Sequence, residues 1–143
     1  MPVILGLHAA LSDLEELSVE DIYKHELMLT QYFIDVIQNL DPDEKFLRII
    51  GKRNTRNRCA VVSVQTLQMD MAQAAFKLDD TYGIMTRVGL HCAPNAHKTL
   101  GTYPEGTLRF SFGPENTTQE LDIALDALSA LLTEDFSHKF FFL

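Results

Sequence analysis

A cysteine, a histidine and two arginines lie within residues 86–117, a stretch punctuated by glycine and proline. Cys92 directly follows His91, Arg87 precedes the pair, and Arg109 comes later in the same stretch. A cysteine reacts as its thiolate, and nearby cations favour that form. A free thiol with a pKa of ~8.5 is only about 3% ionised at pH 7, and lowering that value by ~1.5 units ionises roughly half of it. These residue types predict a reactive thiol, although an unpaired cysteine is also often a small buried hydrophobe.

The two arginines and the histidine each have a chemical and a structural interpretation. A guanidinium group is planar and binds a carboxylate through two hydrogen bonds, so Arg109 is a candidate for binding a carboxylate substrate. The alternative for Arg109 is a strand residue that points to solvent. Arg87 is either part of the same site or a loop anchor, and His91 either helps to set the charge of the thiol or orients the loop.

Two further interpretations of the histidines and cysteines are weaker. His91, Cys92 and His97 are residue types that bind zinc, but the chain offers no clear fourth ligand and their spacing matches no common zinc pattern. We therefore expect no metal site. Cys59 lies in a mostly apolar segment, which predicts a buried position in the core.

Length and composition limit the classes of protein to consider. The chain has 143 residues, enough for a single domain over 1–143, and its hydrophobic fraction of 46% is typical of a soluble globular protein. The formal net charge of −8 argues against general nucleic-acid binding, which requires basic patches. No apolar run reaches the ~20 residues of a membrane span. Two cysteines are too few for a disulfide framework, which predicts a cytoplasmic protein.

Apolar residues recur every three or four positions over residues 4–40, which predicts two helices. Ser18 is expected to cap the second helix, with Asp21 at the capping-box position, and Asp41-Pro42 is expected to end it. The predicted apolar face of the first helix is Ile4, Leu7, Leu11 and Leu14. The predicted buried face of the second is Ile22, Leu29, Phe33, Val36, Ile37 and Leu40.

Four segments rich in β-branched and aromatic residues predict strands. They cover residues 46–50, 59–65, 84–88 and 107–112. The first two are expected to pair as a hairpin. The polar connection between them is either a docking patch or a solvated tip, and it carries Lys52, Arg53, Arg56 and Arg58.

The remaining segments predict two more helices and one loop. A short helix is expected over 69–82, with Gly83 in a left-handed conformation at its end. Its inward residues are predicted to be Ala72, Ala75 and Phe76. The segment between the last two strands is expected to be a loop. Thr117 and Glu120 form a capping-box pattern for a final helix that buries Leu121, Leu125, Leu128 and Leu132. Helices and strands in this order predict an α+β domain.

Three segments, GIMTRVGLHCAP, AHKTLGT and EGTLRFSFGPENT, resemble the C-terminal part of the cysteine desulfurases, members of the class V aminotransferase group of pyridoxal-phosphate (PLP) enzymes. The order Arg-x-Gly-x-His-Cys-Ala-x-x-x-His, a loop, Gly-Thr-x-Arg-x-Ser and then Asn-Thr is long and specific. The softer pattern from Pro2 to Gly83 also fits. The resemblance implies the small C-terminal domain of fold-type-I PLP enzymes, in which a mainly antiparallel four-stranded sheet carries helices on one face.

The resemblance also implies roles for individual residues. Cys92 matches the cysteine that attacks the sulfur of L-cysteine or a related amino acid held on PLP, keeps that sulfur as a persulfide and allows alanine to leave. Arg109 matches the arginine that binds the carboxylate of the substrate. Arg87 and His91 match positions near the cysteine loop.

The chain departs from the family pattern because the large domain, with its Schiff-base lysine and most phosphate-binding residues, is missing from the sequence. Ser137-His138-Lys139 echoes the motif of that lysine, but its position near the C-terminus indicates a coincidence. We therefore expect the isolated chain to bind no PLP and to be inactive. The alternatives are a stand-alone sulfur carrier and a non-catalytic dimerising module. The expected partners are a large PLP domain, a sulfur acceptor protein or a second copy, since the tail Phe140–Leu143 is apolar.

Overall fold

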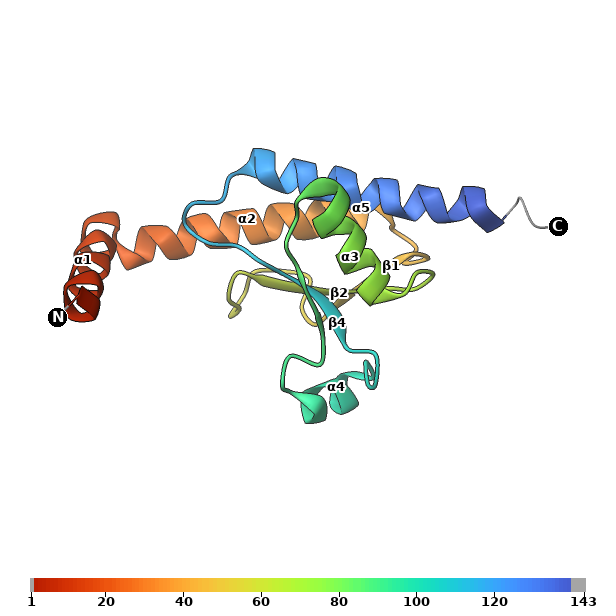
Figure 1. Ribbon diagram of the computed structural model, residues 1–143, viewed down its shortest axis with the longest axis horizontal. Coiled ribbons are helices and arrows are strands. Elements are labelled where there is room, and N and C mark those ends of the chain that lie inside the picture. The colour runs from red at the N-terminus through yellow and green to blue at the C-terminus, as the bar shows by residue number, and fades with distance from the viewer. Residues whose placement is uncertain (1, 140–143) are drawn as a thin grey trace.

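The computed structural model describes the backbone of residues 2–139 and the side chains of residues 2–132, and Figure 1 shows its elements. Within this range the helices are α1 (Pro2–Leu17), α2 (Val19–Leu40), α3 (Met71–Tyr82), α4 (Pro94–Leu100) and α5 (Thr118–Lys139). The strands are β1 (Leu47–Ile50), β2 (Val61–Thr66), β3 (Arg87–Gly89) and β4 (Thr107–Ser111). The predicted α+β architecture is confirmed, but α4 forms where the sequence predicted a loop.

The strands form one antiparallel sheet in the order β1-β2-β4-β3. The predicted hairpin of β1 and β2 is confirmed. Along β4, Leu108 and Phe110 are buried, Arg109 is half-buried and Ser111 is exposed. Because successive side chains of a strand point to opposite faces of the sheet, Arg109 lies on the face that the core does not cover.

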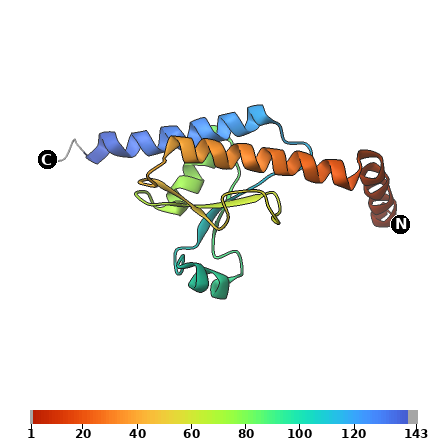
Figure 2. The ribbon, with the colours of Figure 1, turned by 180° about the vertical axis from the view of Figure 1, so that it is seen from behind.

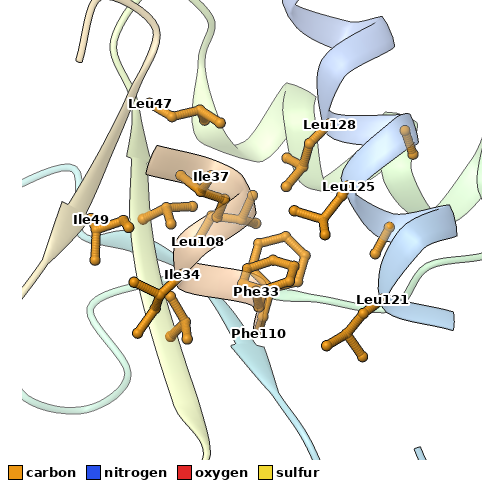
Figure 3. Packing of buried hydrophobic residues seen from close by; sticks show 14 of the residues in the cluster. Phe33, Ile34, Ile37, Leu47, Ile49, Leu108, Phe110, Leu121, Leu125 and Leu128 are labelled. Atoms are coloured by element: carbon orange, nitrogen blue, oxygen red, sulfur yellow. The ribbon is translucent and has the colours of Figure 1, made fainter. Parts of the chain in front are cut away.

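The hydrophobic core lies between the sheet and α2, α3 and α5. Figures 1 and 2 view the molecule from opposite sides, and both show α2 and α5 running along the same side of the sheet. The centroid of the buried Phe33 ring lies 4.9 Å from that of Phe110, and Figure 3 shows both residues. The Phe33 centroid is also 5.1 Å from that of Phe112. Three buried residues of α5 complete this region: Leu121, Leu125 and Leu128. Each such side chain contributes about 1.5–3 kcal/mol on burial, which anchors β4 to the helices.

The two N-terminal helices differ in how much of their predicted faces is buried. In α2, Leu29, Phe33 and Ile37 are buried as predicted, whereas Leu40, the last helical residue, is 42% exposed. Figure 1 shows α1 projecting from the start of α2, and none of its described residues is buried. Ser18 is the N-cap residue of α2, as predicted, but the predicted capping box does not form, because the Ser18 side chain makes no capping hydrogen bond. Its φ of 65° turns the chain between the helices.

Asp41 ends α2, as the sequence predicted, and also positions the start of β1. Its carboxylate accepts hydrogen bonds from the backbone N–H groups of Lys45 (2.9 Å), Phe46 (2.6 Å) and Leu47 (2.8 Å). Burial alone would raise the pKa of Asp41, but these three donors and the charge of Lys45 hold it below its ordinary value. The carboxylate therefore remains ionised and fixes the connection between helix and strand.

The inward face predicted for α3 is wrong, although its existence and its end are confirmed. Phe76 is 66% exposed, Ala72 is exposed and Ala75 is only half-buried. The buried residues are Met71, Ala74 and Leu78. Asp70 caps the helix by accepting a hydrogen bond from Gln73 N, so the helix starts after Asp70. Its buried face begins at Met71 rather than at Ala72. Gly83 adopts the left-handed conformation, with a φ of 68°, as predicted.

The capping box predicted for α5 is confirmed. The backbone N–H of Thr117 donates to a Glu120 carboxylate oxygen at 2.9 Å, and Glu120 N donates to Thr117 Oγ1 at 3.3 Å. The bond from the Thr117 backbone, followed by one from the Asn116 side chain, lowers the pKa of the Glu120 carboxyl group. Leu121, Leu125 and Leu128 are buried as predicted, whereas Leu132 is half-buried.

The boundaries of two predicted strands are displaced, and this changes the interpretation of Cys59. The second strand begins at Val61 rather than at Cys59, and the third covers Arg87–Gly89 rather than 84–88. Cys59 consequently lies in the preceding connection and is exposed, so its predicted position in the core is wrong. In the same connection, Arg58 donates to the backbone oxygen of Lys52 at 2.6 Å. The connection is therefore exposed, and the guanidinium group of Arg58 partly stabilises it.

Two expectations fall partly or wholly outside the described residues. The Phe140–Leu143 tail lies beyond them, as do the side chains of Ser137, His138 and Lys139. Over the part of the chain that is described, no helix combines the length and the apolar character needed to cross a bilayer.

Candidate functional site

Cys92 lies at the tip of a tight turn between β3 and α4. The backbone N–H of Ala93 donates to Leu90 O at 2.8 Å, and the two central residues, His91 and Cys92, have φ angles of 50° and 60°. Two consecutive positive φ angles are typical of a type I′ turn, where asparagine and glycine are preferred. Each non-glycine residue in this conformation carries strain of about 1 kcal/mol or more. Cys92 is exposed, so its interpretation as a buried hydrophobe is wrong.

Helix α4 follows this turn and was missed by the sequence analysis. Pro94 is its first residue, and Gly101 ends it in a left-handed conformation with a φ of 69°. Proline at the start and glycine just past the end are recognised helix signals. Read together, these two residues could have identified the helix, whereas the sequence analysis treated them as loop punctuation. In Figures 1 and 2, α4 lies on the opposite side of the sheet from α2 and α5.

Two buried residues hold α4 to the connection that follows it. His97 is only 5% exposed, Thr102 is fully buried, and His97 Nδ1 lies 2.7 Å from Thr102 Oγ1. The His97 ring centroid is 5.9 Å from that of His91, so the helix also packs beside the turn. The structure therefore brings His91 and His97 together, but the described residues contain no group of three His, Cys, Asp or Glu side chains suited to a metal.

The imidazole of His91 connects the Cys92 turn to β4. His91 Nε2 lies 3.2 Å from both the backbone oxygen and the hydroxyl oxygen of Thr107. A carbonyl oxygen can only accept, so this geometry favours a proton on Nε2. His91 Nδ1 is buried and has no hydrogen-bond partner in the described part of the chain. Burial, followed by the positive charge of Arg109, lowers the pKa of His91, although the bond to Thr107 partly opposes this shift.

The lowered pKa predicts how His91 responds to acid. Because the folded state binds the proton less readily, the stabilising contribution is fully present above the unfolded value of about 6.5 and is lost as the pH falls through the lower folded value. NMR titration of the imidazole is expected to give a midpoint below about 6.5 for His91. The His91→Asn variant assigns the signal and should lose less stability than the wild type between neutral and acidic pH. A midpoint at or above the ordinary value would contradict this.

Two arginines lie directly opposite each other on neighbouring strands near the turn. Arg87 of β3 pairs in register with Arg109 of β4. Arg87 is exposed, whereas Arg109 is half-buried and its Nε is a buried donor without a partner among the described residues. Like charges at opposed positions destabilise a sheet. An anion between the guanidinium groups would remove that cost and satisfy the unpaired donor, so the pair is suited to binding a carboxylate.

Two glycines allow the strands that carry this site to approach closely. A Cβ atom on Gly106 would lie 2.2 Å from both the carbonyl carbon and the oxygen of Gly89. Gly106 also has a φ of 80°, and its oxygen accepts a hydrogen bond from Gln65 Nε2 at 3.2 Å. In the sequence, both glycines are simply part of a stretch punctuated by glycine and proline. Their contact places the end of β3, and therefore the Cys92 turn, against the start of β4.

Comparisons with known proteins show which family and which fold this chain resembles. The sequence pattern of the family described as "Aminotransferase class-V" matches residues 1–124. The probable cysteine desulfurase of Staphylococcus epidermidis is 32% identical over 136 residues, which cover 95% of this chain and 31% of that protein. The probable cysteine desulfurase of Streptomyces coelicolor is 33% identical over 124 residues, covering 87% and 28%. The apo structure of the cysteine desulfurase from Thermococcus onnurineus NA1 has a TM-score of 0.81 at 29% identity, covering 90% and 30%.

The family is PLP-dependent, and among the described residues the lysine nearest in sequence to Cys92 is Lys98. PLP is held by a lysine as a Schiff base. Lys98 is on the helix that follows Cys92, and its ammonium lies over the ring of Tyr103, 5.2 Å from the centroid. Arg87 and Arg109 suit a carboxylate and cannot form an imine.

The chain spans about a third of the length of the curated relatives it matches. The matching part is their C-terminal portion, and the α+β fold agrees with that portion of the solved structure. The family pattern covers most of the chain and includes the turn, β3 and β4. This chain therefore belongs to the class-V aminotransferase family and corresponds to the C-terminal portion of its cysteine desulfurases.

Proposed function

We propose that this chain acts as the C-terminal small domain of a PLP-dependent cysteine desulfurase, with Cys92 as the sulfur-accepting residue. The observation that carries the proposal is the exposed cysteine at the tip of a strained turn, beside two strands that present opposed arginines. An exposed thiol is accessible to a substrate bound outside this domain. The thiolate form of a cysteine is the nucleophile.

The other proposed roles follow from the chemistry of each group. Arg109 binds the carboxylate of L-cysteine or a related amino acid through its planar guanidinium, and its buried, unpaired Nε supplies a donor. Arg87 adds a second cation at the opposed position. His91, held neutral above its lowered pKa, anchors the turn rather than adding charge. The new sulfur–sulfur bond forms at Cys92, and alanine is the remaining product.

The cofactor and its lysine are proposed to come from a large domain that this chain does not contain. When bound, PLP supplies the electron sink that allows the carbon–sulfur bond to break. This chain supplies Cys92 as the sulfur acceptor and Arg109 as the residue that binds the substrate carboxylate. The domain over 1–143 is accordingly proposed to be inactive when isolated.

A chimera tests this proposal directly. The chain replaces the matching C-terminal portion of the Staphylococcus epidermidis desulfurase, and release of sulfide and alanine from L-cysteine is measured with added PLP. We expect turnover by the chimera and none by this chain or by the truncated large domain alone. A folded, PLP-loaded chimera that releases no alanine would contradict the proposed function.

Substitution of Arg109 in the chimera gives a quantitative prediction. Lysine keeps the positive charge but loses the planar pair of donors, so Arg109→Lys is expected to lower kcat/KM for L-cysteine by between about 10-fold and 100-fold. Arg56→Lys is the matched control, because Arg56 is exposed in the connection between β1 and β2. Equal losses in both variants would exclude a specific role for Arg109 in binding the substrate.

Exposure of Cys92 also favours a second candidate function, that of a stand-alone sulfur carrier. In this case Cys92 would receive a persulfide sulfur from a separate, complete desulfurase and pass it to an acceptor protein. The chimera and the carrier give different results, because a carrier gains sulfur from an intact enzyme without joining a large domain. The third possibility, a non-catalytic dimerising module, predicts that neither assay depends on Cys92.

A further inference from the structure

The intrinsic backbone preferences of His91 and Cys92 do not favour the conformation that they adopt in the Cys92 turn. His91 and Cys92 both adopt positive φ angles that glycine or asparagine would adopt at lower cost. One backbone hydrogen bond, from Ala93 N to Leu90 O, closes the turn. Cys92 is exposed and offers little packing in return. The restraint must therefore come from side chains beneath the turn, and His91 is the central residue that contacts the sheet.

Buried polar residues gather beneath this turn. Gln65, His97, Thr102 and Thr107 are 7%, 5%, 0% and 1% exposed. His97 and Thr102 bond to each other, and Gln65 donates to Gly106 O. Thr107 lies opposite Gly89, the last residue of β3, and presents its hydroxyl to His91. Buried polar groups that are hydrogen-bonded favour one arrangement over its alternatives, because breaking a bond leaves an unsatisfied group away from water.

We propose that Thr107 is a positioning residue, whose buried hydroxyl and backbone oxygen together fix the His91 imidazole and thereby hold the strained turn that presents Cys92. The ring is held at one nitrogen by two oxygens of the same residue, each 3.2 Å away. The His97 ring, anchored by Thr102, packs beside it. Rotation of the His91 side chain would break the contact with Thr107 and leave the turn without its link to β4.

The proposal concerns the geometry of the turn, and its importance for sulfur transfer rests on the proposed function. The two are separable, because the turn can be observed without a cofactor or a large domain. Amide exchange of Ala93 reports whether the turn is closed, and the imidazole nitrogen shifts of His91 report which nitrogen carries the proton. Failure of the chimera would leave both readouts unaffected.

The test compares three threonine variants of the full chain by NMR. Thr107→Val keeps the shape but removes the hydroxyl, and it is expected to speed exchange of the Ala93 amide by about fivefold, the effect of one lost hydrogen bond. Thr107→Ser should restore the wild-type rate. Thr30→Val is the matched control: Thr30 is also fully buried, and its hydroxyl donates to Glu26 O at 2.7 Å within α2. This control should affect core amides without selectively affecting Ala93.

Two results would overturn the proposal. One is an unchanged exchange rate of the Ala93 amide in a folded Thr107→Val variant. The other is the same selective increase of that rate in Thr30→Val. If Thr107→Val does not fold, the position of the proton on His91 in the wild-type chain tests the proposal instead. Its His91 must carry the proton on Nε2 at neutral pH, and a proton on Nδ1 instead would show that Thr107 does not fix the ring.

Discussion

Replacing Gly106 with alanine is expected to destabilise the fold by about 2–5 kcal/mol. The new Cβ would lie 2.2 Å from two backbone atoms of Gly89, which cannot move as a side chain could. Forcing the strands apart costs about 1–3 kcal/mol and sometimes more. The φ of 80° at Gly106 adds about 1–2 kcal/mol of strain for an L-residue. Chemical denaturation, followed by circular dichroism, measures the sum.

Gly101→Ala is the matched control for this prediction. Gly101 also has a positive φ, of 69°, but nothing lies within 4 Å of the position where its Cβ would be. It should therefore show only the backbone strain, about 1–2 kcal/mol. The difference between the two variants isolates the close approach of the two glycines. Equal losses of stability in the two variants would mean that β3 and β4 tolerate the added methyl group.

Replacing Cys92 with serine is expected to abolish sulfur release by the active chimera, by at least about a thousandfold in kcat. A hydroxyl oxygen has the same position but does not accept sulfur, and removing the nucleophile of a covalent mechanism typically removes nearly all catalysis. The fold should be unaffected, because the Cys92 side chain is exposed. Sulfide and alanine release from L-cysteine are measured together with the unfolding free energy.

The second cysteine provides the control for that experiment. Cys59 is also exposed, but it lies in the connection between β1 and β2. Cys59→Ser should retain full activity, and it also removes the competing thiol in chemical labelling. A Cys92→Ser chimera that still turns over, or a Cys59→Ser chimera that does not, would place the sulfur-accepting thiol elsewhere.

Local sequence signals predicted most elements of the fold correctly. Both helix-end signals depend only on residues within one helical turn. The capping box of Thr117 and Glu120 and the left-handed Gly83 both have the predicted geometry. Ser18 shows the limit of the same reasoning. It has the right residue type, but its side chain makes no capping bond because the chain turns sharply between α1 and α2.

Burial was harder to predict because it depends on which face another element covers. Phe76 is the most apolar residue in the middle of α3, yet Ala74 and Leu78 face the core. The four exposed apolar residues predicted for α1 form a clear helical stripe that nothing in the described chain covers. Cys59 was assigned to the core because the start of β2 was placed two residues too early.

The sequence predicted which residues could form the candidate site, but it could not show how they are held. Arg87 and Arg109 are opposed only because β3 and β4 pair in one particular register. The contact between His91 and Thr107 joins residues separated by a whole helix and its flanking turns. Such contacts follow from tertiary packing, and a motif read along the chain does not contain them.

Intact-mass analysis with peptide mapping shows whether Cys92 accepts sulfur. The chain is incubated with a complete cysteine desulfurase, L-cysteine and PLP, and in parallel the purified chimera is incubated with L-cysteine and PLP; both are then trapped with an alkylating reagent. The account predicts one added sulfur atom on the peptide that contains Cys92 in the chimera. Sulfur on Cys92 in the isolated chain as well would favour the carrier function. Turnover of the chimera with sulfur on Cys59, or on neither cysteine, would contradict the account.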